Sequence, residues 1–236
     1  MENASIKQKQ EKSTGLLKDV CNSIDCETNP PMNLEDEPYA LKAIAEKQRR
    51  TAMSEHPHIA PLVAYLAAIK AEHSEKDLPC FDPCDGGIHA KVLFLLEAPG
   101  PKAVGSAFIS RNNPDPTARN MCGLLKEAQL ARRDTALWNI VPWYVGTGSK
   151  IRAVNKDDIN EASPYLSELI SLLQELKVIV LVGKKSQSAK SQIAQLTSVP
   201  LMEMPHPSAT VFNAYPHKIT EMRDCLRQVA AIVNGE

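Results

Sequence analysis

Short runs rich in apolar residues recur along the chain and predict the strands of a buried sheet. The clearest is Val92–Leu96, which a Pro-Gly-Pro turn follows almost at once. Runs of four to eight apolar residues bounded by turn residues are typical of strands that are covered on both faces. We expect four such strands, at Val92–Leu96, Ala136–Val141, Val178–Val182 and Leu201–Met204.

Segments with helical spacing of apolar residues lie before and between these runs. In 58–73, for example, Ile59, Leu62, Val63, Leu66 and Ile69 fall on one helical face. We expect helices over 39–53, 58–73, 115–129, within 155–176 with a break near Pro164, and over 184–196 and 217–233. The segment Cys80–Gly87 is expected to be a turn.

The alternation of strands and helices predicts an α/β fold. We expect a three-layer α/β/α sandwich around a central, largely parallel, four-stranded sheet. The two helices within residues 39–73 are expected to cover one side of this sheet. With 236 residues, of which 43% are hydrophobic, the chain is long enough for one well-packed domain, which we place at residues 36–236.

The first 35 residues have a different composition and predict a mobile polar leader. They are rich in Lys, Glu, Asn and Ser and end near Asn29-Pro30-Pro31. The polar start has no hydrophobic signal core, and no apolar run reaches the length that crosses a bilayer. We therefore expect a cytoplasmic protein without a membrane partner.

Charge leaves two interpretations open. The formal net charge is only −1, yet residues 97–152 hold eight basic and four acidic residues. This local excess fits a face that follows nucleic-acid phosphates, and it fits an ordinary solvated surface equally well.

Polar motifs follow three of the predicted strands. Glu97-Ala98-Pro99-Gly100-Pro101 comes after the first, Asn139 lies near the end of the second, and His206-Pro207-Ser208 follows the last. Because ligands collect at the carboxyl edge of parallel sheets, these motifs predict a binding site there.

Together these motifs resemble the uracil-DNA glycosylase superfamily. The resemblance rests on Leu96-Glu97-Ala98-Pro99-Gly100 and His206-Pro207-Ser208-Ala209-Thr210, with Phe108 and Asn139 between them, and covers about Lys91 to the C-terminus. The closest branch has a Glu-Ala-Pro-Gly first motif. The resemblance implies a monofunctional DNA N-glycosylase that flips uracil or a related deaminated base out of DNA and hydrolyses its N-glycosidic bond.

The resemblance also implies roles for individual residues. His206 would hydrogen-bond the developing base oxyanion, and Glu97 would hold the attacking water and offset positive charge on the sugar. Phe108 would stack on the base, and the Asn139 amide would read its edge. Ala98 and Pro99 would complete the base pocket.

Further residues are expected to contact the DNA backbone or the opposite strand. Gly100 and Pro101 form a turn that DNA can approach closely, and Ser208 is expected to bind a phosphate. Val211 or Phe212 would enter the vacated stack. The polar loop 110–117 is expected to contribute Arg111 and Asn112 or Asn113, and Arg119 lies shortly after it.

Structural alternatives accompany these roles. Phe108 could be plain core, Val211 and Phe212 could simply pack under the last helix, and the polar loop could be solvated. Asn139 could be a buried amide tied to the backbone, although its position in an apolar strand favours a functional role.

Two departures from the family pattern keep a second function open. Leu96 stands where the family usually has Gly, and Ala98 replaces the water-activating Asp of the best-known uracil-specific branch. The alternative is a catalytically weak or inactive homologue that binds DNA or nucleotides.

The cysteines do not follow the pattern of the branch with the closest first motif, which holds an iron–sulfur cluster. Cys21, Cys26, Cys80 and Cys84 all precede the first motif, and 141–144 contains no cysteine. We expect no cluster, no other metal and no cofactor, although a metal-dependent hydrolase built on these thiols is a third hypothesis. The expected partner is DNA containing a deaminated base, bound by a monomer.

Overall fold

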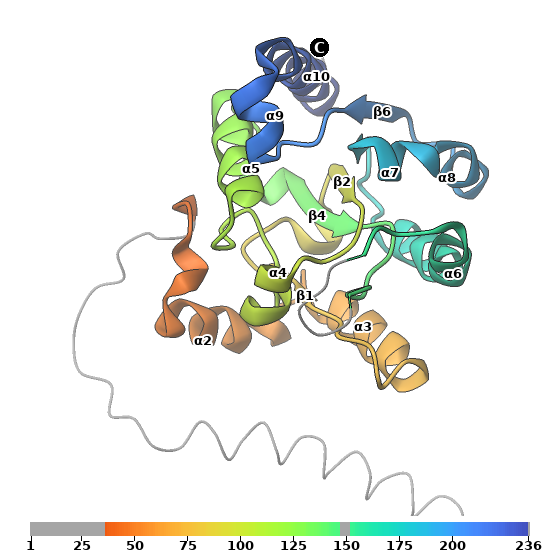
Figure 1. Ribbon diagram of the computed structural model, residues 1–236. Helices are drawn as coiled ribbons and strands as arrows, with labels where there is room; N and C mark the ends of the chain where they lie inside the picture. Colours follow the sequence, from red (N-terminus) through yellow and green to blue (C-terminus); the bar gives the residue numbers. More distant parts are fainter. Residues whose placement is uncertain (1–35, 147–151, 236) are drawn as a thin grey trace, which may run out of the picture. The chain divides into compact units, whose positions relative to one another are not determined.

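The computed structural model describes residues 36–146 and 152–235, and its centre is a parallel sheet (Figure 1). The strands lie in the order β4-β2-β5-β6, with β2 at Val92–Leu96, β4 at Thr135–Asn139, β5 at Val178–Val182 and β6 at Leu201–Met204. All three strand pairs are parallel. The predicted α/β fold class and its four-stranded parallel sheet are therefore confirmed.

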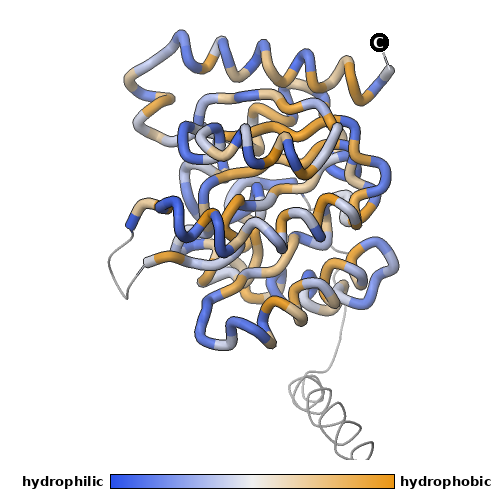
Figure 2. Tube along the Cα trace, turned by 90° about the vertical axis from the view of Figure 1, so that its right-hand side faces the viewer, coloured by the Kyte–Doolittle hydropathy of each residue, from blue (hydrophilic) through white to orange (hydrophobic). Residues whose placement is uncertain are grey.

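The sheet is the apolar centre of the domain. Every residue of β4 and β5 is buried, as are the first four residues of β2. Figure 2 shows hydrophobic segments in the interior of the fold and many hydrophilic residues on the outer helices. The register pairs Leu96 with Asn139 and Val182 with Met204, so the strands end at nearly the same level. The polar residues that follow the strands are thereby held at one edge.

Helices cover both faces of the sheet. On one side lie α5 (Pro116–Glu127) and α10 (Pro216–Asn234), and on the other lie α6 (Lys156–Leu172), α7 (Lys184–Ser188) and α8 (Lys190–Leu196) (Figure 1). Ile140, just after β4, shares a small apolar cavity with residues of α6 and α8. This arrangement gives the three expected layers.

A second, two-stranded sheet lies beside the main one. Its strands β1 (Cys80–Phe81) and β3 (Phe108–Ile109) are parallel. The Phe81 ring stacks on Trp138 of β4, with ring centroids 3.7 Å apart. The sequence predicts only a turn at 80–87, because two residues are too few to display a period.

The N-terminal helices pack on this small sheet and on α6. After η2 (Ala40–Lys42), α2 (Ile44–Ala52) and η3 (Met53–Glu55), helix α3 (Ala60–Glu72) lies against β1 and α6. Tyr65 of α3 places its ring 6.3 Å from that of Phe81 and donates a hydrogen bond to the Tyr165 carbonyl of α6. These helices therefore reach the central sheet largely through β1.

Several helix boundaries differ from the prediction. Helix α6 continues through Pro164, because a capping box at Asn155 and Asp158 fixes its start and buried Ala162, Leu166 and Leu169 hold its inner face. The predicted 184–196 helix is two helices that meet at Ala189. Helices α4 (Pro101–Ser106), α9 (Ala209–Ala214), η4 (Gly87–His89) and η5 (Arg132–Asp134) have no counterpart among the predicted helices.

The predicted leader, residues 1–35, lies outside the described residues. Within the described ranges, no helix is both long enough and apolar enough to span a membrane.

Candidate active site

The carboxyl edge of the sheet brings together polar residues that are far apart in the chain. Glu97 follows β2, Asn139 ends β4, Gly183 follows β5 and His206 lies two residues after β6. Because the four strands are parallel and in register, all of these residues lie at the same edge.

Asn139 is a buried amide that lacks a donor partner. The residue is 4% exposed, and no described residue accepts a hydrogen bond from Nδ2. A buried polar group without a partner destabilises a fold by about 1–3 kcal/mol. Such a group at a ligand-binding edge is suited to a polar ligand that supplies the missing acceptor.

Glu97 is held at one carboxylate oxygen and in its backbone. The Val154 amide donates to Oε1 at 2.8 Å, and the Val141 amide donates to the Glu97 carbonyl at 3.1 Å. The Val154 carbonyl in turn accepts from Lys185 Nζ at 2.9 Å. The segment leading into α6 therefore fixes the Glu97 carboxylate, while the described residues offer Oε2 no hydrogen bond.

His206 is held in its neutral form by its surroundings. Burial lowers the pKa of His206, whereas the nearby Glu97 and Asp115 carboxylates raise it, and the net shift is downward. At neutral pH the imidazole therefore carries one N–H donor and no net charge.

Gly183 lies directly behind His206. A Cβ added to Gly183 would lie 2.9 Å from the His206 Cβ, and the glycine has a φ of +84°. Both the space and the backbone conformation require glycine at this position.

The first motif leads from the buried sheet to the surface. Ala98 is partly buried against the core and Pro99 is buried, while Gly100 and Pro101 are exposed. Gly100 is the extended N-cap residue of α4, and Pro101 begins that helix. The motif therefore presents its last two residues to solvent beside the edge that carries Glu97.

Comparison with known proteins assigns the chain to a family. The family model described as "Uracil DNA glycosylase superfamily" matches residues 83–230, which is more than half of the chain. The chain belongs to the uracil-DNA glycosylase superfamily. No curated protein matches it.

Among solved structures, the chain is similar to a solution NMR structure from Methanosarcina acetivorans, named a "putative Uracil DNA glycosylase". The two share 16% sequence identity with a TM-score of 0.44. The similarity covers 60% of this chain and 91% of that one.

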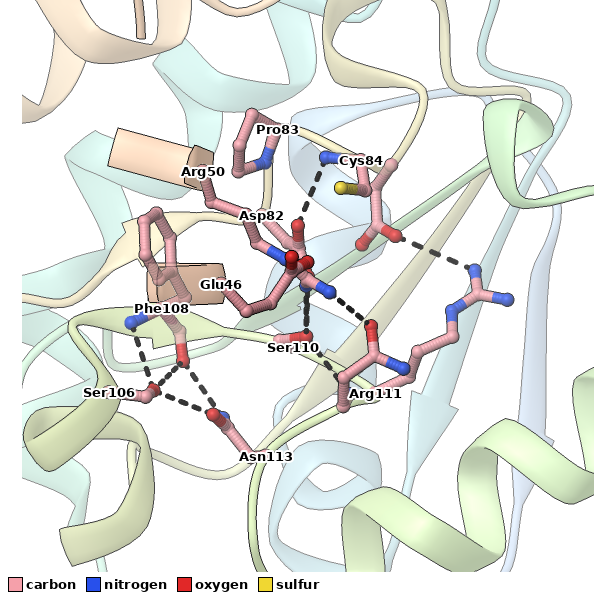
Figure 3. A network of polar contacts seen from close by, with 12 residues as sticks. Glu46, Arg50, Asp82, Pro83, Cys84, Ser106, Phe108, Ser110, Arg111 and Asn113 are labelled. Carbon is pink, nitrogen blue, oxygen red and sulfur yellow. Dashed lines mark hydrogen bonds and ion pairs between the residues drawn. The ribbon is translucent and has the colours of Figure 1, made fainter. Parts of the chain in front are cut away.

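Phe108, the predicted stacking ring of this superfamily member, lies in β3 and is 5% exposed. Its backbone is held on both sides. Ser106 Oγ accepts from the Phe108 amide at 3.2 Å, and Asn113 Nδ2 donates to the Phe108 carbonyl at 2.8 Å (Figure 3). The position of the ring is thus fixed by local side chains, and its stacking role stays a prediction.

The predicted DNA contacts of Arg111 and Asn112 do not agree with the structure. Both residues are 0% exposed, and Asn113 is buried as well. Arg111 donates to Thr135 Oγ1 and lies 3.7 Å from an Asp85 carboxylate oxygen. Asn112 Oδ1 accepts from Arg132 at 2.6 Å and from Arg50 at 2.9 Å. Phosphates cannot reach side chains enclosed in this way.

These residues belong to a buried ionic network that joins distant segments. Asp82 is its centre and receives hydrogen bonds from Arg50, Ser110 and Arg132. Arg50 also binds Glu46 at 2.7 Å, and Arg132 binds Asp85 at 2.9 Å. No local sequence pattern indicates this network, because its partners come from α2, the segment after β1, the 110–113 loop and η5.

The network also changes the interpretation of the basic segment. Of its eight basic residues, Arg111 and Arg132 neutralise carboxylates inside the protein. The local excess of positive charge is therefore only partly available to a nucleic acid.

Other predicted DNA contacts lie nearer the surface. Arg119 is exposed, and Ser208 is partly buried and caps α9 by accepting from the Val211 amide at 3.3 Å. Val211 and Phe212 are partly buried and pack against the core. Their contacts with DNA stay predictions.

Sequence reasoning missed Asp115, Gly183, Lys185 and the Val154 backbone as neighbours of the site. Asp115 accepts from the Ala118 amide at 2.9 Å as the N-cap of α5, and it lies close enough to His206 to raise its pKa. Gly183 could have been identified from the sequence, because it lies between the predicted strand Val178–Val182 and the predicted helix over 184–196. The role of Val154 was not visible, because it depends on the backbone alone.

Two of the four cysteines that precede the first motif lie within the described residues. Cys80 and Cys84 are free, whereas Cys21 and Cys26 lie outside the described residues. Arg49 donates to the Cys84 sulfur at 3.3 Å. Across residues 36–146 and 152–235, no three His, Cys, Asp or Glu side chains form a group that could hold a metal ion.

Proposed function

We propose that this superfamily member is a monofunctional DNA glycosylase that removes uracil or a related deaminated base. The proposal rests on the unpartnered Asn139 amide at the same sheet edge as Glu97 and a neutral His206. Superfamily membership supports it.

The Asn139 amide would recognise the base. A flipped uracil offers a carbonyl oxygen and an N–H side by side, and a carboxamide can bond both. The buried Nδ2 would gain an acceptor at that moment, so binding would relieve a cost present in the free protein.

His206 and Glu97 would stabilise charge that grows as the glycosidic bond breaks. The departing base becomes negative at its O2 oxygen, and a neutral imidazole N–H would donate a hydrogen bond to it. The sugar becomes positive, and the Glu97 carboxylate would offset that charge. Oε2 would accept a hydrogen bond from the attacking water, while the Val154 amide holds Oε1.

The test is release of free base from duplex oligonucleotides carrying uracil, hypoxanthine, xanthine or a thymine mismatch, followed by abasic-site detection. We expect release from at least one of them. His206→Ala should lower the single-turnover rate by about 10²–10³-fold, the loss typical of one oxyanion donor. Asn139→Ala should abolish the preference among the bases.

His89→Ala is the matched control. His89 is a largely exposed histidine in η4, before β2 and therefore at the opposite edge of the sheet, and it pairs with Glu175. Its substitution should leave the rate unchanged. An unchanged rate in His206→Ala would contradict the mechanism, and tight binding of every oligonucleotide without turnover would select the non-catalytic homologue.

A further inference from the structure

Helix α5 holds the turn that follows His206. Asn120 of α5 is 7% exposed, and its Nδ2 donates to the Pro207 carbonyl at 3.0 Å. The two residues are 87 positions apart in the chain. This hydrogen bond therefore joins α5 to the His206-Pro207-Ser208 turn.

Besides this hydrogen bond, the backbone of the His206-Pro207-Ser208 turn makes few polar contacts with the described residues. Proline has no N–H, and the Ser208 amide donates to the His206 carbonyl at 2.9 Å. On the side of β5, Gly183 lies against the His206 Cβ. His206 is thus set between the β5 end and a turn whose carbonyl is anchored to α5.

The orientation of the Asn120 amide is defined by its second partner. Arg119 Nη2 and Nε lie 3.3 and 3.4 Å from Asn120 Oδ1. Because a guanidinium only donates and a carbonyl only accepts, Oδ1 must face Arg119 and Nδ2 must face Pro207. The reverse orientation would place two acceptors together.

We propose that Asn120 is a positioning residue that fixes the imidazole of His206 for catalysis by holding the Pro207 carbonyl. This inference rests on the proposed glycosylase function. It predicts that loss of the amide donor misplaces His206 while DNA binding, which uses other groups, is preserved.

The first test compares Asn120→Asp and Asn120→Ala with the parent chain in single-turnover release of uracil. Asp keeps the shape of the side chain and removes the donor. We expect both variants to lose about 10- to 100-fold in rate, as a displacement of about 1 Å can produce, with oligonucleotide affinity changed less than about threefold. A fall in affinity with an unchanged rate would overturn the proposal.

Leu125→Ala is the control for a loss of stability. Leu125 is a fully buried residue of the same helix. Assays run well below the melting temperature of all variants should give this control the parent rate. If it slows release as much as Asn120→Asp, the effect is one of general stability and the proposal fails.

A double-mutant cycle tests whether Asn120 acts through His206. In the His206→Ala background, Asn120→Ala should cost less than about threefold, because the group that it positions is already absent. Equal losses in both backgrounds would overturn the proposal.

An NMR measurement that does not depend on base release tests the positioning role separately from the proposed function. The ring signals of His206, assigned by their absence in His206→Ala, should shift in NMR spectra of Asn120→Ala, which removes the donor without adding a charge, and their titration midpoint should change, while Leu125→Ala leaves both unaltered. Unchanged His206 signals in Asn120→Ala would refute the positioning role. A chain that releases no base but shows these shifts would refute the glycosylase function alone.

Discussion

Gly183 lies against His206, the candidate catalytic histidine, in a backbone conformation that favours glycine. It combines a positive φ with a 2.9 Å approach of any added Cβ to His206. A non-glycine residue in such a conformation carries a strain of about 1–3 kcal/mol. Any relief of the clash must move the histidine or the β5 end.

We predict that Gly183→Ala destabilises the fold by about 1–3 kcal/mol and slows uracil release at least about tenfold, because His206 is displaced. Urea unfolding and single-turnover assays measure the two effects. Gly123→Ala in α5 is the control, since a Cβ there meets nothing within 4 Å. Full activity in Gly183→Ala would mean that the histidine tolerates the displacement.

At this scale the sequence identified the candidate catalytic residues but not what surrounds them. Glu97, Asn139 and His206 could be named as candidates because each lies near or shortly after the end of a predicted strand. Arg111 and Asn112 were assigned to DNA because a polar loop is normally exposed. Their burial depends on Asp82, Asp85 and Arg50, whose proximity no local pattern indicates.

At the scale of elements, the buried ionic network joins α2 to the 110–113 loop, which follows the strand that contains Phe108. Burial alone would raise the pKa of Asp82, but the Arg132 and Arg50 guanidiniums and the Ser110 hydroxyl hold it below its usual value. The folded state therefore favours the ionised carboxylate, which contributes stability above the unfolded pKa of about 3.9. That contribution is lost as the pH falls through the folded value.

We predict that Asp82→Asn lowers the free energy of unfolding at pH 7 by about 3–5 kcal/mol, since it leaves buried arginines without their carboxylate. The difference from the parent chain should begin to shrink below about pH 3.9, where the Asp82 carboxyl of the unfolded chain becomes protonated, and should vanish below the lower pKa of the folded state. Urea unfolding across this range measures it. Asp224→Asn, at an exposed pair with Arg227, should change little. A difference independent of pH would argue against an ionised Asp82.

Strands were easier to predict than helices for a physical reason. Three of the four central strands coincide with their predicted bounds, because short runs rich in apolar residues and bounded by turn residues mark strands directly in the sequence. Helix ends depend on caps and on tertiary contacts, which is why α6 passes through Pro164 and why the 184–196 segment divides at Ala189. The two-residue strands β1 and β3 are strands only because they pair with each other, and this pairing is not visible in the sequence.

At the scale of the whole molecule, exposed arginines lie near both ends of the parallel strands, one near the carboxyl edge of the sheet and one near the amino edge. Arg119 lies on α5, one residue before the Asn120 that contacts the His206 turn, and Arg133 lies in η5 before β4. Since the net charge is −1, attraction to DNA must come from such local residues.

We predict that Arg119→Ala reduces the salt dependence of binding to a uracil-containing duplex by about one in the slope of log affinity against log salt. Arg133→Ala, at the amino edge, should leave that slope unchanged. Fluorescence anisotropy at several salt concentrations measures both. Equal slopes for the two variants would place the DNA elsewhere than at the carboxyl edge.

The ionic network also bears on where the folding unit starts. Similarity to the superfamily begins at residue 83, but Glu46, Arg50 and Asp82 precede that point. A fragment trimmed to the matched region would enclose Arg132 and Arg111 while discarding much of their counter-charge, Asp82 and Asp36 included. The region that matches the superfamily model and the region that we expect to fold on its own therefore have different limits. We expect that a fragment must include helix α2 to fold independently.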